Sequence, residues 1–222
     1  MPTSIISRNR NYLGLLAANT ILGSAMPMLI ILGGLAGLLL APSIALATLP
    51  ASLQTLAGLL AAAPFSLLMG KLGRKTGFVT GVAVAIVGAL IGVWALFAGS
   101  FILLCIAHLA LGAALACYQY FRFAAAETVS TEWRPVAISL MLTSGLIAAF
   151  VGPQMFIVAK DAFAQVPLAG AYAALVAFSL IGLIPLALTT LPNPSKITPR
   201  SLKQRLSSLS VLKRKPIRLA VG

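Results

Sequence analysis

The sequence has very few acidic residues and few charges of any kind. Its 222 residues include three Asp and Glu, one His and two Cys, and only 9% are charged while 60% are hydrophobic. Soluble domains are about 45–50% apolar and about 25% charged, so a chain of this length is too small to bury so much apolar surface. The mean hydropathy of +1.04 therefore predicts a protein of the lipid bilayer. The composition also excludes an intrinsically disordered chain and a disulfide-stapled secreted domain.

The sequence also lacks the residue patterns that carry enzyme chemistry. It contains no His-Glu-x-x-His, no Gly-x-Ser-x-Gly and no phosphate-binding loop. We therefore expect no enzyme activity, no catalytic residue, no cofactor and no metal. The net charge of +13 is compatible with a nucleic-acid binder, but the basic residues are confined to short stretches between apolar runs. This arrangement is typical of membrane topology, so we expect no nucleic-acid partner.

Long uncharged runs predict an all-α membrane protein with six transmembrane helices. A span takes about 20 residues, and the runs between charged residues are long enough for six, with turns where Pro42 and Gly99 fall. The predicted spans are 12–40, 44–69, 78–97, 101–126, 136–158 and 168–191. We expect three regions: an N-terminus (1–11), the bundle (12–191) and a basic tail (192–222).

The basic residues predict the orientation of the bundle. If the N-terminus is cytoplasmic, 15 of the 16 Lys and Arg are cytoplasmic and only Lys160 is outside, as the positive-inside rule requires. Both termini are then cytoplasmic. A cleaved signal peptide is the alternative for the N-terminus, but the apolar run after Arg10 is much longer than the about 7–15 residues of a signal core.

The tail after Leu191 differs from the bundle. Three prolines prevent a continuing helix, and residues 201–212 then carry Leu202, Leu206 and Leu209 beside basic residues. This pattern predicts an amphipathic helix at the anionic cytoplasmic leaflet. The apolar segment 217–222 is expected to be the start of an absent seventh span.

Four short motifs resemble, in order and spacing, motifs of the major facilitator superfamily. They are 70–77 (GKLGRKTG), similar to the loop between helices 2 and 3; 108–113 (HLALGA), similar to the helix 4 motif; 127–140, similar to the end of helix 4 and the charged loop after it; and Gly145, Gly152 and Pro153, similar to the helix 5 motif of the antiporter branch. The resemblance covers residues 12–191 and implies the N-terminal six-helix half of a twelve-helix transporter. It also implies a cytoplasmic gate at Gly70, Arg74, Lys75, Gly77, Glu127 and Arg134.

Three of these motifs depart from the family patterns. Arg74 stands where the loop pattern has Asp, His108 stands where the helix 4 pattern has Arg, and Phe156-Ile157 replace the last two glycines of the helix 5 pattern. The arginine that the family uses for proton coupling is therefore not at its usual place, although Arg122 lies further along the same predicted helix. The resemblance assigns no substrate.

The fourth predicted span carries one polar face. His108, Gly112, Leu115, Gln119 and Arg122 follow each other at steps of four and three residues, which places them on one side of a helix. Such a face should look into the bundle or a water-filled cavity. His108 is either a proton relay, since histidine titrates near neutral pH, or an interhelical hydrogen-bonding group. Arg122 either reaches the membrane interface or pairs with Glu127.

Other polar residues have two interpretations each. Asn19, Gln54 and Gln154 either line a substrate cavity or make interhelical hydrogen bonds. Glu127 among Arg74 and Lys75 is either a cytoplasmic latch or part of a solvated cluster that sets topology. Gly145, Gly152 and Pro153 are expected to permit close packing and a bend.

The predicted function is transport of an unidentified small solute by a proton-coupled secondary transporter of the bacterial inner membrane. Since transporters of this family bind substrate between two six-helix halves, we expect a second half as partner, either a second copy or a separate C-terminal half. The alternatives are a non-transporting membrane subunit or assembly partner, and a truncated, inactive remnant.

Overall fold

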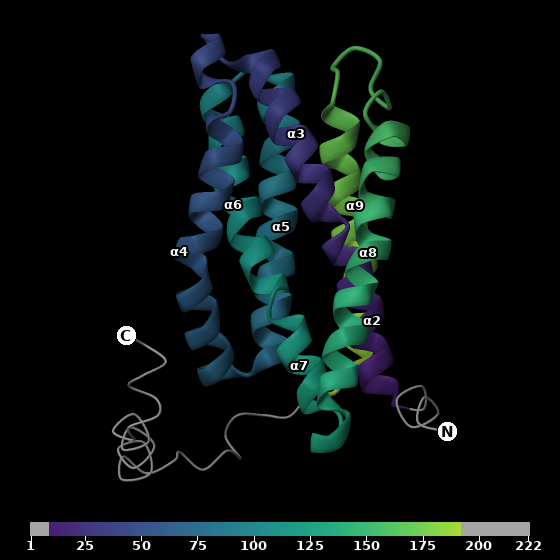
Figure 1. Cartoon of the computed structure of the whole chain (residues 1–222). Helices are drawn as coiled ribbons and strands as arrows, with labels where there is room; N and C mark the ends of the chain where they lie inside the picture. The colour runs from purple at the N-terminus through teal and green to yellow at the C-terminus, as the bar shows by residue number, and fades with distance from the viewer. Residues whose placement is uncertain (1–8, 192–222) are drawn as a thin grey trace, which may run out of the picture. The chain divides into compact units, whose positions relative to one another are not determined.

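The structure, a computed structural model, describes residues 9–191 and contains only helices and their connections in that range (Figure 1). The expectation of six apolar helices is confirmed, and each is long enough to cross a membrane. Their bounds are Arg10–Leu40, Ile44–Leu72, Arg74–Phe97, Phe101–Glu127, Thr131–Ala159 and Ala169–Leu188. The predicted tail helix at 201–212 and the apolar segment 217–222 lie outside the described residues.

The first span consists of two helices, α2 (Arg10–Gly23) and α3 (Ala25–Leu40), rather than one. The side chain of Asn9 caps α2 by accepting a hydrogen bond from the backbone N–H of Tyr12 (3.1 Å). The chain breaks at Ser24 because Pro27 has no N–H for the carbonyl of Gly23, four residues earlier. The break lets the two helices follow different neighbours.

The fourth span is also interrupted, which corrects the prediction of one continuous helix. Helix α6 (Phe101–Tyr118) ends before Gln119, and α7 (Phe121–Glu127) begins after Tyr120. At the break the N–H of Tyr120 bonds to the carbonyl of Cys117, three residues back (3.1 Å), which tightens the turn. The Tyr120 hydroxyl donates to the carbonyl oxygen of Ala62 and fixes the turn against α4 (2.8 Å).

The connection between the second and third spans is very short. The second span consists of a 3₁₀ turn, η1 (Ile44–Leu46), and the helix α4 (Leu49–Leu72). A single residue, Gly73, separates α4 from α5 (Arg74–Phe97). Gly73 makes this turn with a φ of +99°, which favours glycine. Arg74 and Lys75 therefore lie on the first turn of α5 and not in a loop as predicted. The fifth and sixth spans are η2 (Thr131–Trp133) followed by α8 (Arg134–Ala159), and α9 (Ala169–Leu188).

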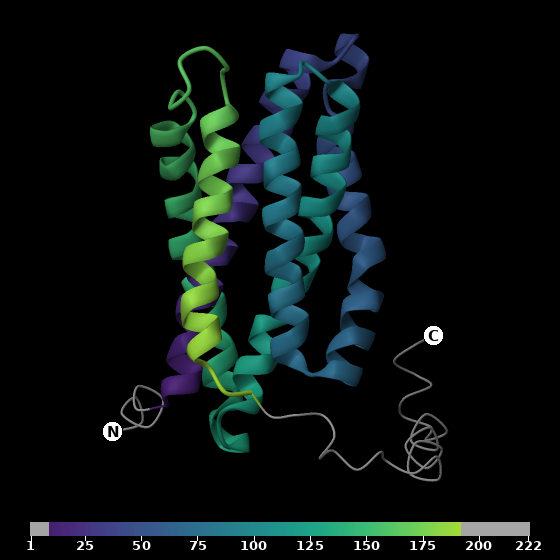
Figure 2. The ribbon, with the colours of Figure 1, turned by 180° about the vertical axis from the view of Figure 1, so that it is seen from behind.

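The spans pack as one bundle in which α5 and α9 form the back and α4, α3 and α8 are seen from the front (Figures 1 and 2). Glycines allow the closest contacts. A Cβ on Gly112 of α6 would lie 2.0 Å from the backbone oxygen of Gln54 in α4, and one on Gly152 of α8 would lie 2.4 Å from that of Ser24. The predicted close-packing role of Gly152 is thus visible in the structure, with Pro153 beside it inside α8.

Candidate functional site

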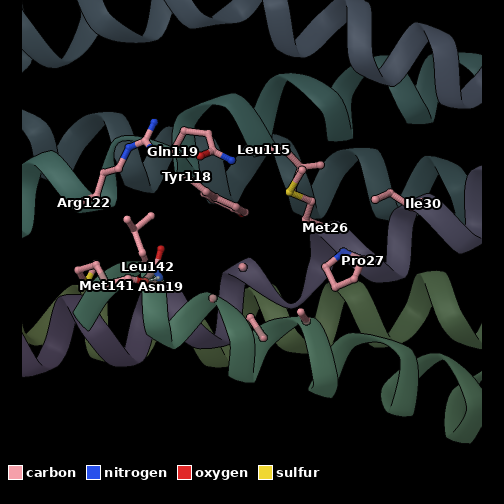
Figure 3. A pocket seen from close by; sticks show the side chains of 14 residues that line it. Asn19, Met26, Pro27, Ile30, Leu115, Tyr118, Gln119, Arg122, Met141 and Leu142 are labelled. Atoms are coloured by element: carbon pink, nitrogen blue, oxygen red, sulfur yellow. Dashed lines mark hydrogen bonds between the residues drawn. The ribbon is translucent and has the colours of Figure 1, made fainter. Parts of the chain in front are cut away.

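The bundle contains two neighbouring cavities that share part of their lining. The first, of about 310 Å³, lies between the first span, α6 and α8, and the second, of about 370 Å³, lies between α3, α4 and the fourth span. The linings of the two cavities have four side chains in common, namely Met26, Leu115, Gln119 and Arg122. Figure 3 shows Gln119 and Arg122 next to each other on one wall of the first cavity, across from Asn19 and Met141.

Arg122 is the cation of both cavities. Its Nε is buried and has no hydrogen-bond partner among residues 9–191, while its Cζ lies 5.1 Å from the centre of the Phe123 ring. Of the two alternatives for Arg122, the pair with Glu127 is wrong, because Glu127 accepts two hydrogen bonds from Arg74 instead. The physical reason is spacing, since residues five apart do not face each other on a helix. No ion pair to Arg122 is found within residues 9–191, which contain all three acids of the chain.

Asn19 of α2 lines the first cavity and also joins two helices. Its Nδ2 donates to Ser144 Oγ at 2.8 Å and to the Met141 carbonyl at 3.2 Å, both on α8. The two interpretations of Asn19 are therefore compatible. Its amide nitrogen holds α8 against α2, and the same side chain forms part of the cavity wall.

Gln54 of α4 lines the second cavity and contacts His108. His108 is fully buried in α6, its Nδ1 lies 2.8 Å from Gln54 Oε1, and its Nε2 lies 2.7 Å from the hydroxyl of Tyr172 in α9. These contacts favour the interhelical alternative for His108, and the proton relay stays a prediction. Tyr172 is 64 residues away in sequence, and no periodic pattern links it to His108.

The other predicted site residues are divided. Gly145 of α8 lines the first cavity, and the predicted close packing at this glycine is wrong because a Cβ there would meet no atom within 4 Å. Gln154, on the same helix, is exposed and lines neither cavity. Tyr118 was not predicted, yet it lines the first cavity. A tyrosine in an apolar helix gives no sequence signal that distinguishes such a position from core packing.

The predicted gate residues lie at the end of the bundle that holds the α4–α5 turn and α7 (Figure 1). The pair between Arg74 and Glu127 joins α5 to α7. Lys75 Nζ donates to the carbonyls of Ala187 and Thr189, at 2.7 and 2.8 Å, which is the favourable place for a cation at the end of α9.

The remaining gate residues make fewer contacts. Gly77 packs so closely that a Cβ would lie 2.3 Å from Met69 Cγ, whereas a Cβ on Gly70 would meet nothing within 4 Å. Arg134 is exposed at the start of α8. The latch and the topology cluster are both compatible with these contacts, and the latch stays a prediction.

Comparisons with known proteins agree with this architecture. No family model matches the chain. The riboflavin transporter RfnT of Brucella anthropi is 32% identical over 194 residues, which cover 87% of this chain and 49% of that protein. The structure of the E. coli fucose:proton symporter FucP has the same fold, with a TM-score of 0.65 and 18% identity over 90% of this chain and 55% of the symporter.

The chain therefore spans about half the length of both proteins. Its six apolar helices, the likeness to the riboflavin transporter and the shared fold point to the same membrane architecture. The chain is a multi-pass membrane protein, and it has the fold of one six-helix half of a major facilitator transporter.

Proposed function

We infer that the chain is one six-helix unit of a secondary transporter that carries a small solute past Arg122. The observation that carries this inference is the unpaired cation shared by both cavities, beside the amide of Gln119. Charged groups are costly inside a membrane bundle and usually mark a substrate or ion pathway. An arginine that structure alone required would be expected to have an acid beside it.

The donors in these cavities favour a solute that is rich in hydrogen-bond acceptors. Arg122 offers only N–H groups, and the walls around it are mostly apolar, with Met26, Leu115 and Leu142. A flat aromatic ring with carbonyl oxygens along one edge fits this combination. Riboflavin has that chemistry, and the similarity to a riboflavin transporter makes a flavin the first solute to test.

A second six-helix unit is part of the proposal. Wall residues of the cavities are exposed, including Met26 (45%), Ile30 (61%) and Leu142 (56%), so the cavities open at the surface of the bundle. The two spans that flank them are also the least buried. Within the apolar 18-residue segment of each span, 22% of the residues are buried in the span of α4 and 28% in that of α8, against 33–44% in the other spans. A second unit, as a second copy or a separate half, would cover this face.

Coupling to protons belongs to the same proposal. The three acids lie at the ends of helices or in connections, with Glu127 closing α7, Glu132 in η2 and Asp161 after α8. His108 is enclosed with partners on both ring nitrogens. We therefore propose, against the relay alternative for His108, that the proton-binding group lies in a separate second half, and we expect uptake to depend on a pH gradient even in His108→Gln.

Uptake of riboflavin tests the function. Bacteria that lack their own riboflavin importer would express the chain alone or with a second six-helix unit, and labelled riboflavin in the cells would be measured with and without a protonophore. We expect accumulation with the second unit or from an oligomer, and its loss with the protonophore. A chain that assembles with its partner, as the mass in detergent shows, yet gives no uptake of riboflavin or of any solute in a mixed panel would favour the non-transporting subunit.

The orientation is tested by cysteine labelling. We propose that both termini and the α4–α5 turn are cytoplasmic, with the bacterial inner membrane as the location. In a Cys105→Ala background, an impermeant thiol reagent added to intact cells should modify Asp161→Cys and spare Gly70→Cys. Gly70 is preferred to Gly73 because it has free space, whereas Gly73 has a positive φ. The reverse labelling pattern would overturn the orientation.

A further inference from the structure

Gln54, His108 and Tyr172 form a chain of hydrogen bonds across three helices. The chain runs from the second cavity at Gln54, through His108, to the Tyr172 hydroxyl, with distances of 2.8 and 2.7 Å. His108 and Tyr172 are fully buried, and Gln54 is 9% exposed. The chain therefore begins at the cavity wall and ends in the interior of the bundle.

The chemistry of the three groups gives the chain a direction. A carbonyl oxygen only accepts, so the proton between Gln54 Oε1 and His108 must be on Nδ1. A neutral imidazole has one N–H, so Nε2 accepts and the Tyr172 O–H donates to it. Every proton that lies between these three side chains then has an acceptor.

The opposite direction leaves a buried proton unsatisfied. If the amide were turned so that Gln54 donated to Nδ1, His108 would donate from Nε2 to the Tyr172 oxygen. The Tyr172 proton would then have no acceptor, because no other hydrogen bond of this hydroxyl is found within residues 9–191. Such a buried donor costs about 1–3 kcal/mol. An imidazolium would leave the same proton unpaired and add a buried charge with no acid in contact.

The direction decides what Gln54 offers to the cavity. Its Oε1 is used by His108, and its Nε2 has no hydrogen bond among the described residues but is not enclosed. We propose that Tyr172 and His108 act as positioning residues that make Gln54 a fixed N–H donor at the wall of the second cavity, where it binds an acceptor oxygen of the solute. The existence of a solute rests on the proposed function, whereas the direction of these hydrogen bonds does not.

The direction of the hydrogen bonds can be measured directly because His108 is the only histidine of the protein. The full chain would be produced with ¹⁵N-labelled histidine and a histidine-free purification tag, and the two ring nitrogens would be assigned by NMR in bilayers at pH 7. We expect a neutral ring with its proton on Nδ1. A proton on Nε2, or a charged ring, would overturn the proposal.

Tyr172→Phe tests whether the hydroxyl sets this direction. The variant keeps the ring that packs on Gly92, where a Cβ would lie 2.4 Å from Tyr172 Cδ1, and removes only the donor. We expect the Nδ1–H form to give way to a mixture of both forms while the chain stays folded. An unchanged single form would show that Tyr172 does not control His108.

Gln54→Glu tests the donor itself, because a carboxylate accepts from His108 but offers no proton to the cavity. In a transporting system we expect riboflavin uptake to fall at least about tenfold, and Gln165→Glu, in the exposed connection before α9, serves as the matched control. Normal uptake in Gln54→Glu would overturn the donor role. If the unmodified chain carries neither riboflavin nor any solute of the mixed panel, the proposed function fails, and the NMR result still decides the direction of the hydrogen bonds.

Discussion

Arg122→Gln is expected to lose solute uptake while the bundle remains folded. The guanidinium is the one cation that lines both cavities, and it has no acid beside it in the described range. Removing one partner of a buried charge-assisted contact typically costs about 2–5 kcal/mol, so uptake should fall at least about 30-fold. Labelled riboflavin in the uptake system described above gives the measurement.

Stability distinguishes a substrate-binding arginine from a structural one. The buried Nε of Arg122 has no partner, so Arg122→Gln removes an uncompensated group and should leave the unfolding temperature in detergent unchanged or raised. Arg122→Lys keeps the charge but loses the planar fork, and should recover only part of the uptake. Arg10→Gln, at an exposed position at the start of α2, is the control for losing one positive charge. A fall in both stability and uptake would mean that Arg122 holds the fold.

The same arginine shows what the sequence could and could not predict. The steps of three and four residues predicted that Arg122 lies on an inward face of the helix, because polar side chains are costly in contact with lipid. The lack of an acidic partner for Arg122 in the described range could not be predicted, because Glu127 pairs with Arg74, which lies 53 residues away in the sequence. Local spacing restricts which residues share a helix face, but it does not reveal which other helix approaches that face.

The spans were predictable for a similar reason. Lipid requires about 20 apolar residues for each crossing, so all six helices could be located from the missing charges. The break at Gln119 and Tyr120 could not, because neither residue is a Gly or a Pro. It depends on a hydroxyl that reaches Ala62 on another helix.

Glycines give the same lesson, because similar positions in the sequence have different surroundings. Gly112 and Gly34 both lie inside apolar helices, yet a Cβ on Gly34 would meet no atom within 4 Å. A Cβ on Gly112 would lie 2.0 Å from the backbone oxygen of Gln54 and 2.8 Å from its Cα. Backbone atoms of a packed helix cannot move aside as a flexible side chain can, so only one of the two glycines is required by packing.

Gly112→Ala is therefore expected to destabilise the bundle, whereas Gly34→Ala is not. Alanine gains about 1 kcal/mol over glycine in a helix interior, and this gain should be visible alone in Gly34→Ala as an equal or higher unfolding temperature. At Gly112 the gain is opposed by overpacking, which typically costs about 1–3 kcal/mol and occasionally more. Because the clash is with backbone, we expect the cost to exceed the gain and the unfolding temperature of the purified chain to fall.

The clash in Gly112→Ala should also displace α4 and so affect the candidate site. Moving α4 away from α6 lengthens the 2.8 Å contact between Gln54 and His108, so the ¹⁵N signals of the single histidine should change in Gly112→Ala and stay unchanged in Gly34→Ala. Equal unfolding temperatures and equal histidine signals in the two variants would contradict the close approach of α4 and α6. That approach places Gln54 at the cavity wall, so the same pair of variants tests the packing on which the donor role depends.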